Sequence, residues 1–347
     1  GEVAQIEMGQ SPPSITYNSE GIGLPFFQGK ADFGDIYPTT RKWCSSPNKI
    51  AEKDDILLSV RAPIGDVNIA TQRCCIGRGL TAIRAGAKSD SKYLFYHLLF
   101  SQELLESKGT GTTFKQINKE TVTHFLIPLP PLAEQRAIAH VLTSIQRAIE
   151  ATEQVIAAAR ELKKALMRHL FTYGPVPPAE AESVPLQETE IGPLPVHWRV
   201  VRLGEISEVK YGKANPNDSG SIPIVGSGGI FANTSTPLVT HPTLVIGRKG
   251  TAGKVWLFLS PCYPSDTTFY LHWKKEIDVS FVFYFLNLRP LSGEHAKTTL
   301  PSLQKPYLEN TSVPLPPLPE QRAIAEMLGA VDEKIQAEER RKAALQS

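Results

Sequence analysis

The sequence predicts an α/β (α+β) protein with two similar domains, each followed by a proline hinge and a helix. The main observation is an internal repeat, because PLPPLAEQRAIA at 128–139 returns as PLPPLPEQRAIA at 314–325. A second observation is the helical spacing of the apolar residues that follow each copy. Repetition on this scale indicates the architecture before single residues are interpreted. We divide the chain into domain 1–131, helix 132–172, Pro/Glu-rich linker 173–195, domain 196–317 and helix 318–347.

The two domains also match upstream of the hinge. GEVAQIEMGQ at 1–10 is similar to GEISEVKYGK at 204–213. DDILLSVRAPIGDV at 54–67 is similar to PTLVIGRKGTAGKV at 242–255, and this match aligns Arg61 with Arg248. The matched segments predict that both domains have the same fold.

A third match lies just before the hinge, where GTTFKQINK at 111–119 aligns with KTTLPSLQK at 297–305. It pairs Thr112 with Thr298 and Thr113 with Thr299. The segment IGPLPVHWRVVRL, which precedes the second GE, has no counterpart before the first one. We therefore expect residue 1 to be a truncation point.

The first predicted helix carries an apolar stripe with alternating spacings of four and three residues, as in a coiled coil. About 40 residues at about 1.5 Å each give a rod of roughly 60 Å. Such a stripe needs a partner helix, and the second copy offers one. We expect the helix interface to contain Ile138, Val141, Leu142, Ile145, Ile149, Val155, Ile156 and Leu162 of the first helix, and Ile324, Met327, Leu328, Val331 and Ile335 of the second.

The proline hinge predicts a well-defined start for each helix. Consecutive prolines cannot continue a strand ladder and favour polyproline II, so the chain leaves each domain along a stiff path. Pro319 suits a first helical turn, and Glu134 and Glu320 lie where the helix dipole favours an acid. The PxxP pattern is also found in ligands of SH3 domains, an alternative disfavoured because both copies adjoin amphipathic helices.

The segment GPVPPAEAESVPLQETEIGPLP at 174–195 separates the two repeats. It contains four glutamates and no basic residue. A proline-rich and acidic composition is typical of extended linkers, so the sequence predicts an extended linker here.

Composition limits the classes of protein that fit. The 347 residues are 41% hydrophobic, yet no apolar run approaches the roughly 20 residues that cross a bilayer. The four cysteines include a vicinal pair and form no CxxC motif, so we expect reduced thiols and a cytoplasmic protein. A net charge of +2 argues neither for nor against a polyanionic partner.

The sequence lacks the common catalytic signatures. RKGTAGKV at 248–255 has the wrong spacing for a phosphate loop, and no Ser or Thr follows Lys254. GxSxG, HExxH and GxGxxG are absent, and GSGG at 226–229 indicates only a turn. NPND at 215–218 departs from the NPP-aromatic motif of adenine methyltransferases at two positions. We predict no catalytic residue, no metal site and no bound cofactor in this chain.

Three features together carry a family resemblance: the duplicated PPLxEQ helix start, the IGRKGTAG loop at 246–253, and the W...LGE start of the second unit at 198–205. With them, nearly the whole chain resembles the specificity subunit of type I restriction-modification enzymes. The resemblance implies two target recognition domains, each reading one half of a split double-stranded DNA sequence. It also implies that the helices pair antiparallel as a spacer.

The same resemblance implies the partners. The subunit would place two methyltransferase subunits, which bind S-adenosylmethionine, on DNA, and restriction motor subunits can join them. The absent opening segment and the short last helix are departures that we expect to weaken partner docking.

Residues shared by the two domains should fold the domain or hold phosphates, whereas bases should be read where the domains differ. We predict backbone contacts by Arg61 and Arg248, with weaker candidates in Lys115, Lys249, Lys254, Thr112, Thr113, Thr298 and Thr299. We predict base contacts from two unmatched polar segments, by Lys30, Arg41 and Lys42 in 29–43 and by Lys213, Asn215 and Asn217 in 211–221.

A competing hypothesis is a coiled-coil interaction scaffold that never binds DNA, which the near-neutral net charge would suit. The matching Arg and Lys loops of the two domains favour DNA. A methyltransferase ranks third because its cofactor-binding sequence is absent.

Overall fold

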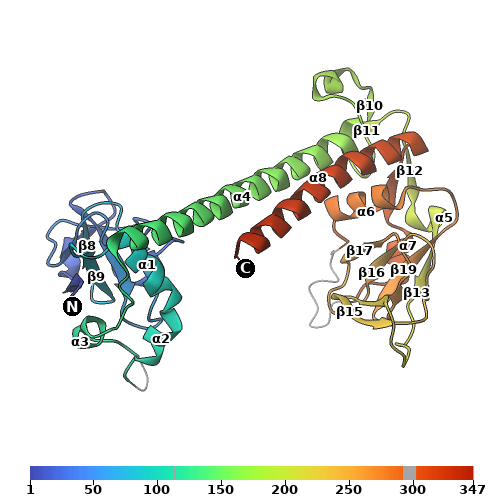
Figure 1. Cartoon of the computed structure of the whole chain (residues 1–347). Coiled ribbons are helices and arrows are strands. Elements are labelled where there is room, and N and C mark those ends of the chain that lie inside the picture. Colours follow the sequence, from blue (N-terminus) through green and yellow to red (C-terminus); the bar gives the residue numbers. More distant parts are fainter. Residues whose placement is uncertain (112–114, 292–301, 347) are drawn as a thin grey trace. The chain divides into compact units, whose positions relative to one another are not determined.

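The computed structural model describes residues 1–111, 115–291 and 302–346 (Figure 1). The chain divides into two compact units, Gly1–Ile149 and Glu150–Ser347. The boundary falls inside one helix, α4 (Leu132–Tyr173), so each unit contains part of it.

Unit 1 is built on a four-stranded antiparallel sheet in the order β1–β9–β6–β7. Its central strand β6 is buried on both faces, because alternate side chains of a strand point to opposite sides. Ile56 and Leu58 pack with helix α1 (Ser91–Phe100), and Leu57 packs with the second sheet. The strands are β1 (Ala4–Met8), β6 (Ile56–Ser59), β7 (Val67–Ile69) and β9 (Leu80–Ala85), and the second sheet contains β2 (Tyr17–Asn18), β3 (Leu24–Phe27), β4 (Trp43–Cys44), β5 (Ile50–Ala51) and β8 (Cys74–Ile76).

Unit 2 repeats this plan, with a sheet in the order β13–β19–β16–β17. Leu244 and Ile246 of its central strand pack with helix α6 (Val279–Leu288), and Val245 packs on the other side with Val225 of the smaller sheet. The strand order and the layers are the same as in unit 1, so the predicted fold class of two similar α/β domains is confirmed. The strands are β13 (Ser207–Tyr211), β16 (Thr243–Gly247), β17 (Val255–Phe258) and β19 (Thr268–Trp273), with β14 (Ile222–Gly226), β15 (Gly229–Thr234) and β18 (Tyr263–Pro264) in the smaller sheet.

The shorter elements differ between the units, and one difference lies next to the hinge. In unit 2, β12 (Arg199–Arg202) pairs with β20 (Ser312–Leu315), whereas residues 126–129, which align with β20, form no strand. The remaining helices are α2 (Gln102–Ser107) and α3 (Lys119–Thr123) in unit 1, and α5 (Leu203–Ile206) and α7 (Lys305–Glu309) in unit 2; short 3₁₀ helices cover Ser14–Thr16, Lys30–Asp32 and Pro178–Ser183.

Helix α8 (Leu318–Gln346) runs antiparallel to the second half of α4. Three ion pairs join the helices: Lys163 to Asp332, Arg160 to Glu339 and Glu153 to Lys342, each at 2.6 Å. The partner numbers rise along α8 as they fall along α4, which establishes the direction. Ion pairs this exposed are worth about 1 kcal/mol or less each, so they contribute more to register than to stability.

The apolar contact of α4 lies on one flank of the predicted stripe. Ile156 sits between two of these ion pairs and is 7% exposed, and Ile324, Leu328 and Ile335 of α8 are equally well buried. Val155 and Leu162 of α4 and Met327 of α8 are instead 42%, 58% and 44% exposed. The expectation that these three pack between the helices was wrong. The apolar stripe of each helix is wider than the surface that the other helix covers, so the residues along one edge of the stripe stay exposed to solvent.

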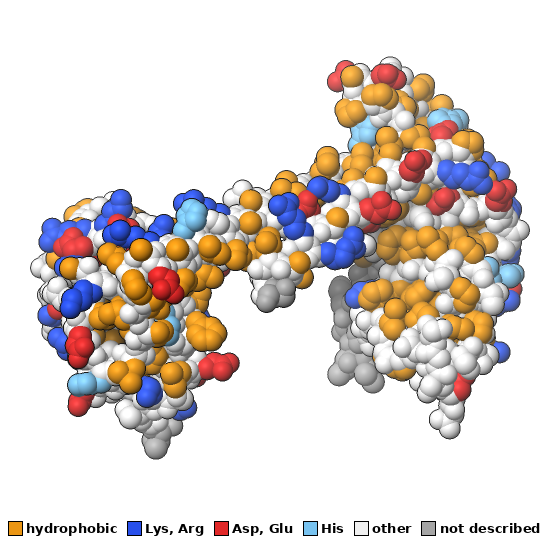
Figure 2. Space-filling model, in the orientation of Figure 1, with side chains coloured by type: hydrophobic (Ala, Val, Ile, Leu, Met, Phe, Trp, Pro, Cys, Tyr) orange, Lys and Arg blue, Asp and Glu red, His pale blue; other side chains and the backbone are white. Residues whose placement is uncertain are grey.

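The first half of α4 also presents apolar residues to solvent. Ile138, Val141 and Ile145, which the sequence placed in an interface with the second helix, are 37%, 56% and 36% exposed. Figure 2 shows hydrophobic side chains at the surface of the long helix. Leu142, Ile149 and Val331 are half-buried.

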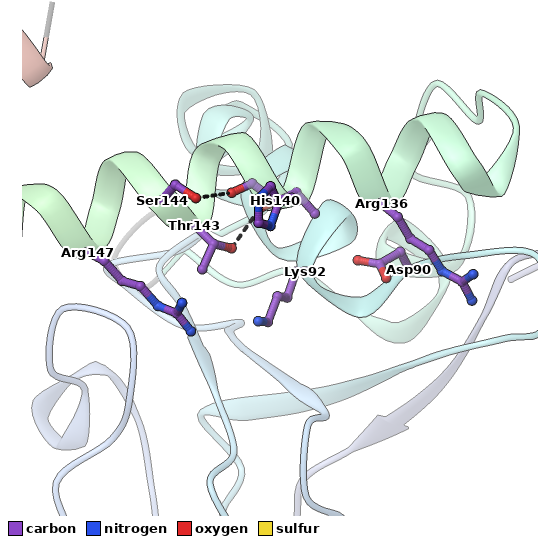
Figure 3. Close-up of a pocket in the computed structure, with 8 residues that line it drawn as sticks. Asp90, Lys92, Arg136, His140, Thr143, Ser144 and Arg147 are labelled. Atoms are coloured by element: carbon purple, nitrogen blue, oxygen red, sulfur yellow. Dashed lines mark hydrogen bonds between the residues drawn. The ribbon is translucent and has the colours of Figure 1, made fainter.

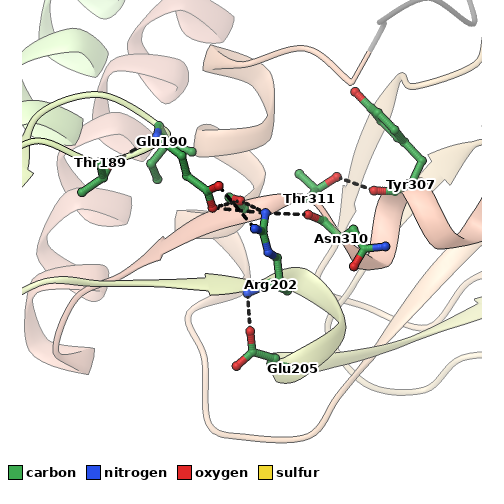
Figure 4. Close-up of polar contacts among 9 residues, drawn as sticks. Thr189, Glu190, Arg202, Glu205, Tyr307, Asn310 and Thr311 are labelled. Carbon is green, nitrogen blue, oxygen red and sulfur yellow. Dashed lines mark hydrogen bonds and ion pairs between the residues drawn. The ribbon is translucent and has the colours of Figure 1, made fainter.

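The predicted extended linker is folded over its second half. Strands β10 (Leu186–Gln187) and β11 (Leu194–Pro195) form a hairpin, and Ile191 and Leu194 enter the core of unit 2. Glu190 accepts hydrogen bonds from Arg202 and Ser312 (Figure 4). The expectation was wrong here because two apolar side chains and one ion pair stabilise the segment despite its proline content.

A buried glutamine fixes the start of each long helix. Gln135 is fully buried; its side-chain oxygen accepts from the Asp90 N–H at 2.9 Å, and its amide donates to the carbonyls of Lys88 and Pro130. Gln321 does the same in unit 2: it accepts from the Asp278 N–H at 3.0 Å and donates to the Pro316 carbonyl at 2.9 Å. Each glutamine joins the proline hinge to the N-terminus of α1 or α6, which explains why the EQ phrase occurs twice.

All four cysteines are free and buried, so the prediction of reduced thiols is confirmed. Burial raises the pKa of Cys74 and of Cys262 to about 12. None of the described helices combines the length and the apolarity that a bilayer crossing requires.

We predict that Gln321→Met lowers the free energy of unfolding of unit 2 by about 2–3 kcal/mol, because it leaves buried backbone groups without partners. Urea unfolding followed by tryptophan fluorescence measures this, since three of the four tryptophans, Trp198, Trp256 and Trp273, lie in unit 2. Gln154→Met, on the exposed surface of α4, is the matched control and should change stability by less than about 0.5 kcal/mol. Equal effects of the two substitutions would contradict the role assigned to Gln321.

Candidate nucleic-acid interface

In unit 2, the loop that follows β16 is a tight turn with two lysines at its surface. Gly247 and Gly253 lie close together, because the Gly253 N–H donates to the Gly247 carbonyl and the Gly247 N–H donates to the Lys254 carbonyl, both at 2.8 Å. Gly253 has φ +83°, a conformation that favours glycine. The turn leaves the Lys249 side chain exposed.

Arg248 is held inside this loop. Its guanidinium donates to the Asp266 carbonyl at 2.8 Å and lies over the ring of Tyr211 at 5.3 Å and that of Phe269 at 5.9 Å. Its backbone N–H donates to the Thr267 carbonyl at 2.9 Å. These contacts make Arg248 a positioning residue for the loop, whereas the sequence predicted a contact with the DNA backbone, which nothing in the structure tests.

Lys254 lies over the Trp256 ring at 4.1 Å, an arrangement that keeps its charge at the surface and its stem packed. Lys249 and Lys254 therefore bracket the loop with two positive charges. Sequence reasoning missed the supporting residues Tyr211, Trp256 and Thr267, because they come from other elements of the fold and carry no local motif.

In unit 1, the matching loop follows β6 and is joined to the segment before α3. The Ala62 N–H donates to the Lys115 carbonyl at 3.2 Å, and the Ser59 hydroxyl donates to the carbonyls of Arg61 and Pro63. The structure thus brings Arg61 and Lys115 together, and both are exposed. Unlike Arg248, Arg61 has no hydrogen bond or ion pair from its side chain within the described residues.

The predicted reading segment of unit 1, residues 29–43, is anchored on β7. The Asn68 side chain exchanges hydrogen bonds with the backbone of Gly34 at 3.1 and 3.0 Å. Lys30 forms an ion pair with Asp66 at 2.7 Å, which reduces its availability for DNA, while Arg41 and Lys42 are exposed.

The predicted reading segment of unit 2, residues 211–221, is tied down on both sides. The Tyr263 hydroxyl donates to the Ala214 carbonyl at 2.7 Å, and Asp218 accepts from Ser235 and Thr234. These hydrogen bonds hold the pKa of the Asp218 carboxyl below its usual value. The segment exposes the three candidate readers, Lys213, Asn215 and Asn217.

Four candidates, Thr112, Thr113, Thr298 and Thr299, lie outside the described residues. The described part of the chain contains no cluster of three His, Cys, Asp or Glu side chains arranged to hold a metal ion.

A second basic surface of unit 1 lies between α1 and α4, around a hollow of about 210 Å³ (Figure 3). Lys92, Arg136 and Arg147 line it and form no ion pair within the described residues. Ser91, which precedes Lys92 at the start of α1, donates a hydrogen bond to the carbonyl of Asp54, just before β6. Arg61 follows the other end of β6, so the hollow lies at the end of this strand that is remote from Arg61. It therefore does not extend the surface formed by Arg61 and Lys115.

Comparisons with known proteins give a consistent result. A family model described as the type I restriction modification DNA specificity domain matches residues 1–160 and 195–347. Over 169 residues the chain is 47% identical to a protein of Methanocaldococcus jannaschii provisionally named the type I restriction enzyme MjaX specificity subunit, covering 48% of the chain and 40% of that relative. Over 285 residues it is 30% identical to the MjaVIII specificity subunit of the same organism, covering 73% of the chain and 66% of the relative. The matches span two thirds or less of either relative's length.

The fold is similar to that of a solved protein. The crystal structure of a type I restriction-modification system S subunit from M. genitalium matches with a TM-score of 0.70 at 20% identity, covering 99% of this chain and 91% of the other. At this identity the match establishes the fold alone.

We predict that Arg248→Ala lowers the free energy of unfolding of unit 2 by about 1–3 kcal/mol, because it removes a charged hydrogen bond and an aromatic contact. Arg61→Ala should change the stability of unit 1 by less than about 0.5 kcal/mol, since its side chain is exposed. Urea unfolding of both variants measures the difference, and equal losses would contradict the distinction between the two arginines.

Proposed function

Because the chain belongs to the family of type I restriction-modification specificity subunits, we propose that it binds a split double-stranded DNA target, one half-site per unit. The observation that carries the proposal is the repeat itself. Two units with the same strand order expose basic loops at the same point, Arg61 and Lys115 in one and Lys249 and Lys254 in the other. Their unmatched segments differ in length and chemistry, which suits two different half-sites.

Helix α4 is the proposed spacer between the half-sites. It is one continuous helix of 42 residues that contributes to both units. Half-sites about one helical turn of DNA apart, roughly 34 Å, face the same side of the duplex. A helix resists bending far better than a loop of the same length, so its length would set the separation of the two half-sites.

The proposed role of the subunit is non-catalytic. Methyltransferase subunits, carrying S-adenosylmethionine, would supply the chemistry, and restriction subunits would join the same complex in the cytoplasm. The exposed apolar residues Val155 and Leu162 support partner binding, because they lie two helical turns apart on one face of α4 and exposed apolar surface marks interaction sites. A partner helix laid along α4 would cover them.

The scaffold hypothesis explains the helices equally well but gives no reason for the recognition units. It would not require two copies of a loop that displays paired cations. The DNA-binding proposal accounts for both features.

We predict that the chain, assembled with the methyltransferase subunits of its native locus, directs adenine methylation to one split sequence. Mapping methylated adenines in the native genome with and without the chain measures this. Loss of a single split-motif pattern is the expected result. An unchanged methylation map, with no methyltransferase in a pull-down, would refute the proposal and favour the scaffold.

We also predict that Leu162→Glu weakens methyltransferase binding by about 100-fold or more, since it places an unpaired charge in an apolar interface. Leu162 is 58% exposed in the free chain, so the stability of the chain itself should hardly change. Gln154→Glu places the same charge on α4 away from the apolar stripe and is the matched control. Analytical ultracentrifugation of the mixed subunits distinguishes the two variants. Equal binding by both would show that Leu162 does not lie in the interface.

A further inference from the structure

The β14–β15 hairpin of unit 2 carries an unusual apolar tip. Its turn is Ser227–Gly228, and the next residues, Ile230 and Phe231, are 62% and 57% exposed. Asn233, further along the strand, is exposed as well. Neighbouring residues of a regular strand point to opposite faces, and both Ala232 and Asn233 are exposed, so the ribbon meets solvent on two sides.

A β-bulge directs the Phe231 side chain. Val225 pairs with Ile230 and Ile224 pairs with Ala232, which leaves Phe231 as the extra residue without a partner on β14. Bulges of this kind are found next to functional sites, where they change the direction of a side chain. A Cβ atom at Gly226 would lie 3.2 Å from the Phe231 ring, so glycine there lets the ring lie against the backbone.

The hairpin tip is joined to the basic loop of the same unit. The Ser227 N–H donates to the Thr267 hydroxyl at 3.3 Å, and the Thr267 carbonyl accepts from the backbone of Arg248 and Lys249. On the other side, a Cβ at Gly229 would lie 3.1 Å from the Trp256 ring, which also packs under Lys254. Two lysines therefore flank an apolar ribbon tip.

The two units differ at this same point of the fold. In unit 1, β3 pairs antiparallel with β4 and parallel with β8, as β14 pairs with β15 and β18 in unit 2. The connection between the antiparallel strands is residues 28–42 in unit 1 and only residues 227–228 in unit 2. The first connection contains the predicted readers Arg41 and Lys42, so its counterpart is the place to expect readers in unit 2.

We propose that the β14–β15 hairpin enters the major groove of DNA and that Phe231 and Asn233 contact the base pairs of the half-site read by unit 2. The inference rests on the proposed function and deepens it. The major groove admits a two-stranded β-ribbon, the thymine methyl group suits an apolar contact, and an amide can pair with adenine. Lys249 and Lys254 are placed to hold the flanking phosphates.

The test uses the complete complex with its methyltransferase subunits, and DNA in which both half-sites are randomised. Phe231→Ala and Asn233→Ala should each reduce discrimination at one or two base pairs of one half-site by about tenfold or more. The other half-site and the salt dependence of binding should stay as in the original complex, because no phosphate contact is removed. Sequencing of the bound DNA reports all three quantities.

Leu259→Ala is the matched control, because Leu259 is 63% exposed on the same unit at the end of β17 that is remote from Lys254. It should leave both half-site preferences unchanged. The inference would be overturned if the complexes with Phe231→Ala and with Asn233→Ala both kept the original base preference at every position. A uniform loss of affinity for all DNA sequences would overturn it as well. A complex of the original chain without any split-sequence preference would instead refute the proposed function itself.

Discussion

The buried glutamine at the start of each long helix is the interaction on which the rest of the structure depends. Gln135 and Gln321 lie where three chain segments meet: the proline hinge, the first helical turn and the N-terminus of α1 or α6. A buried amide is stable only when its donors and acceptor are paired, so the three segments can meet in few other ways. The direction in which each helix leaves its domain is therefore fixed within its first turn.

This arrangement separates the parts that give stability from the parts that give recognition. Both units keep the central sheet, the covering helix and the glutamine joint, all of which are buried. They differ in the connection that follows β3 or β14. In unit 2 this connection is a short exposed turn, whereas in unit 1 its Phe33 and Ile36 pack against the core. An exposed turn such as that of unit 2 can change sequence at little cost to folding, as the proposed reading of two different half-sites requires.

The sequence was sufficient for the repeat, the pairing of the two helices and the fold class, because these depend on periodicity and on matched phrases. The antiparallel direction of the helices was implied by the family resemblance. It could not show which flank of the α4 stripe faces α8, since Ile156 and Val155 look alike in an apolar pattern. Nor could it separate Arg61 from Arg248, which align perfectly. The aromatic rings and the carbonyl that hold Arg248 come from distant strands, and proximity of that kind has no local signal. The sequence did not indicate the exposed apolar tip at Phe231, because the neighbouring GSGG motif indicates only a turn.

The modest charge of the chain bears on how such a protein could select DNA. Each phosphate contact contributes about 0.9 to the salt slope of binding, so a unit that offers two exposed lysines or an Arg–Lys pair would bind nonspecific DNA weakly by itself. Joining two weak units through one helix makes the second contact intramolecular, and the combined affinity then far exceeds that of either unit. Only DNA with both half-sites at the right separation gains this advantage. A net charge of +2 is thus compatible with the proposed specific binding and would keep nonspecific binding low.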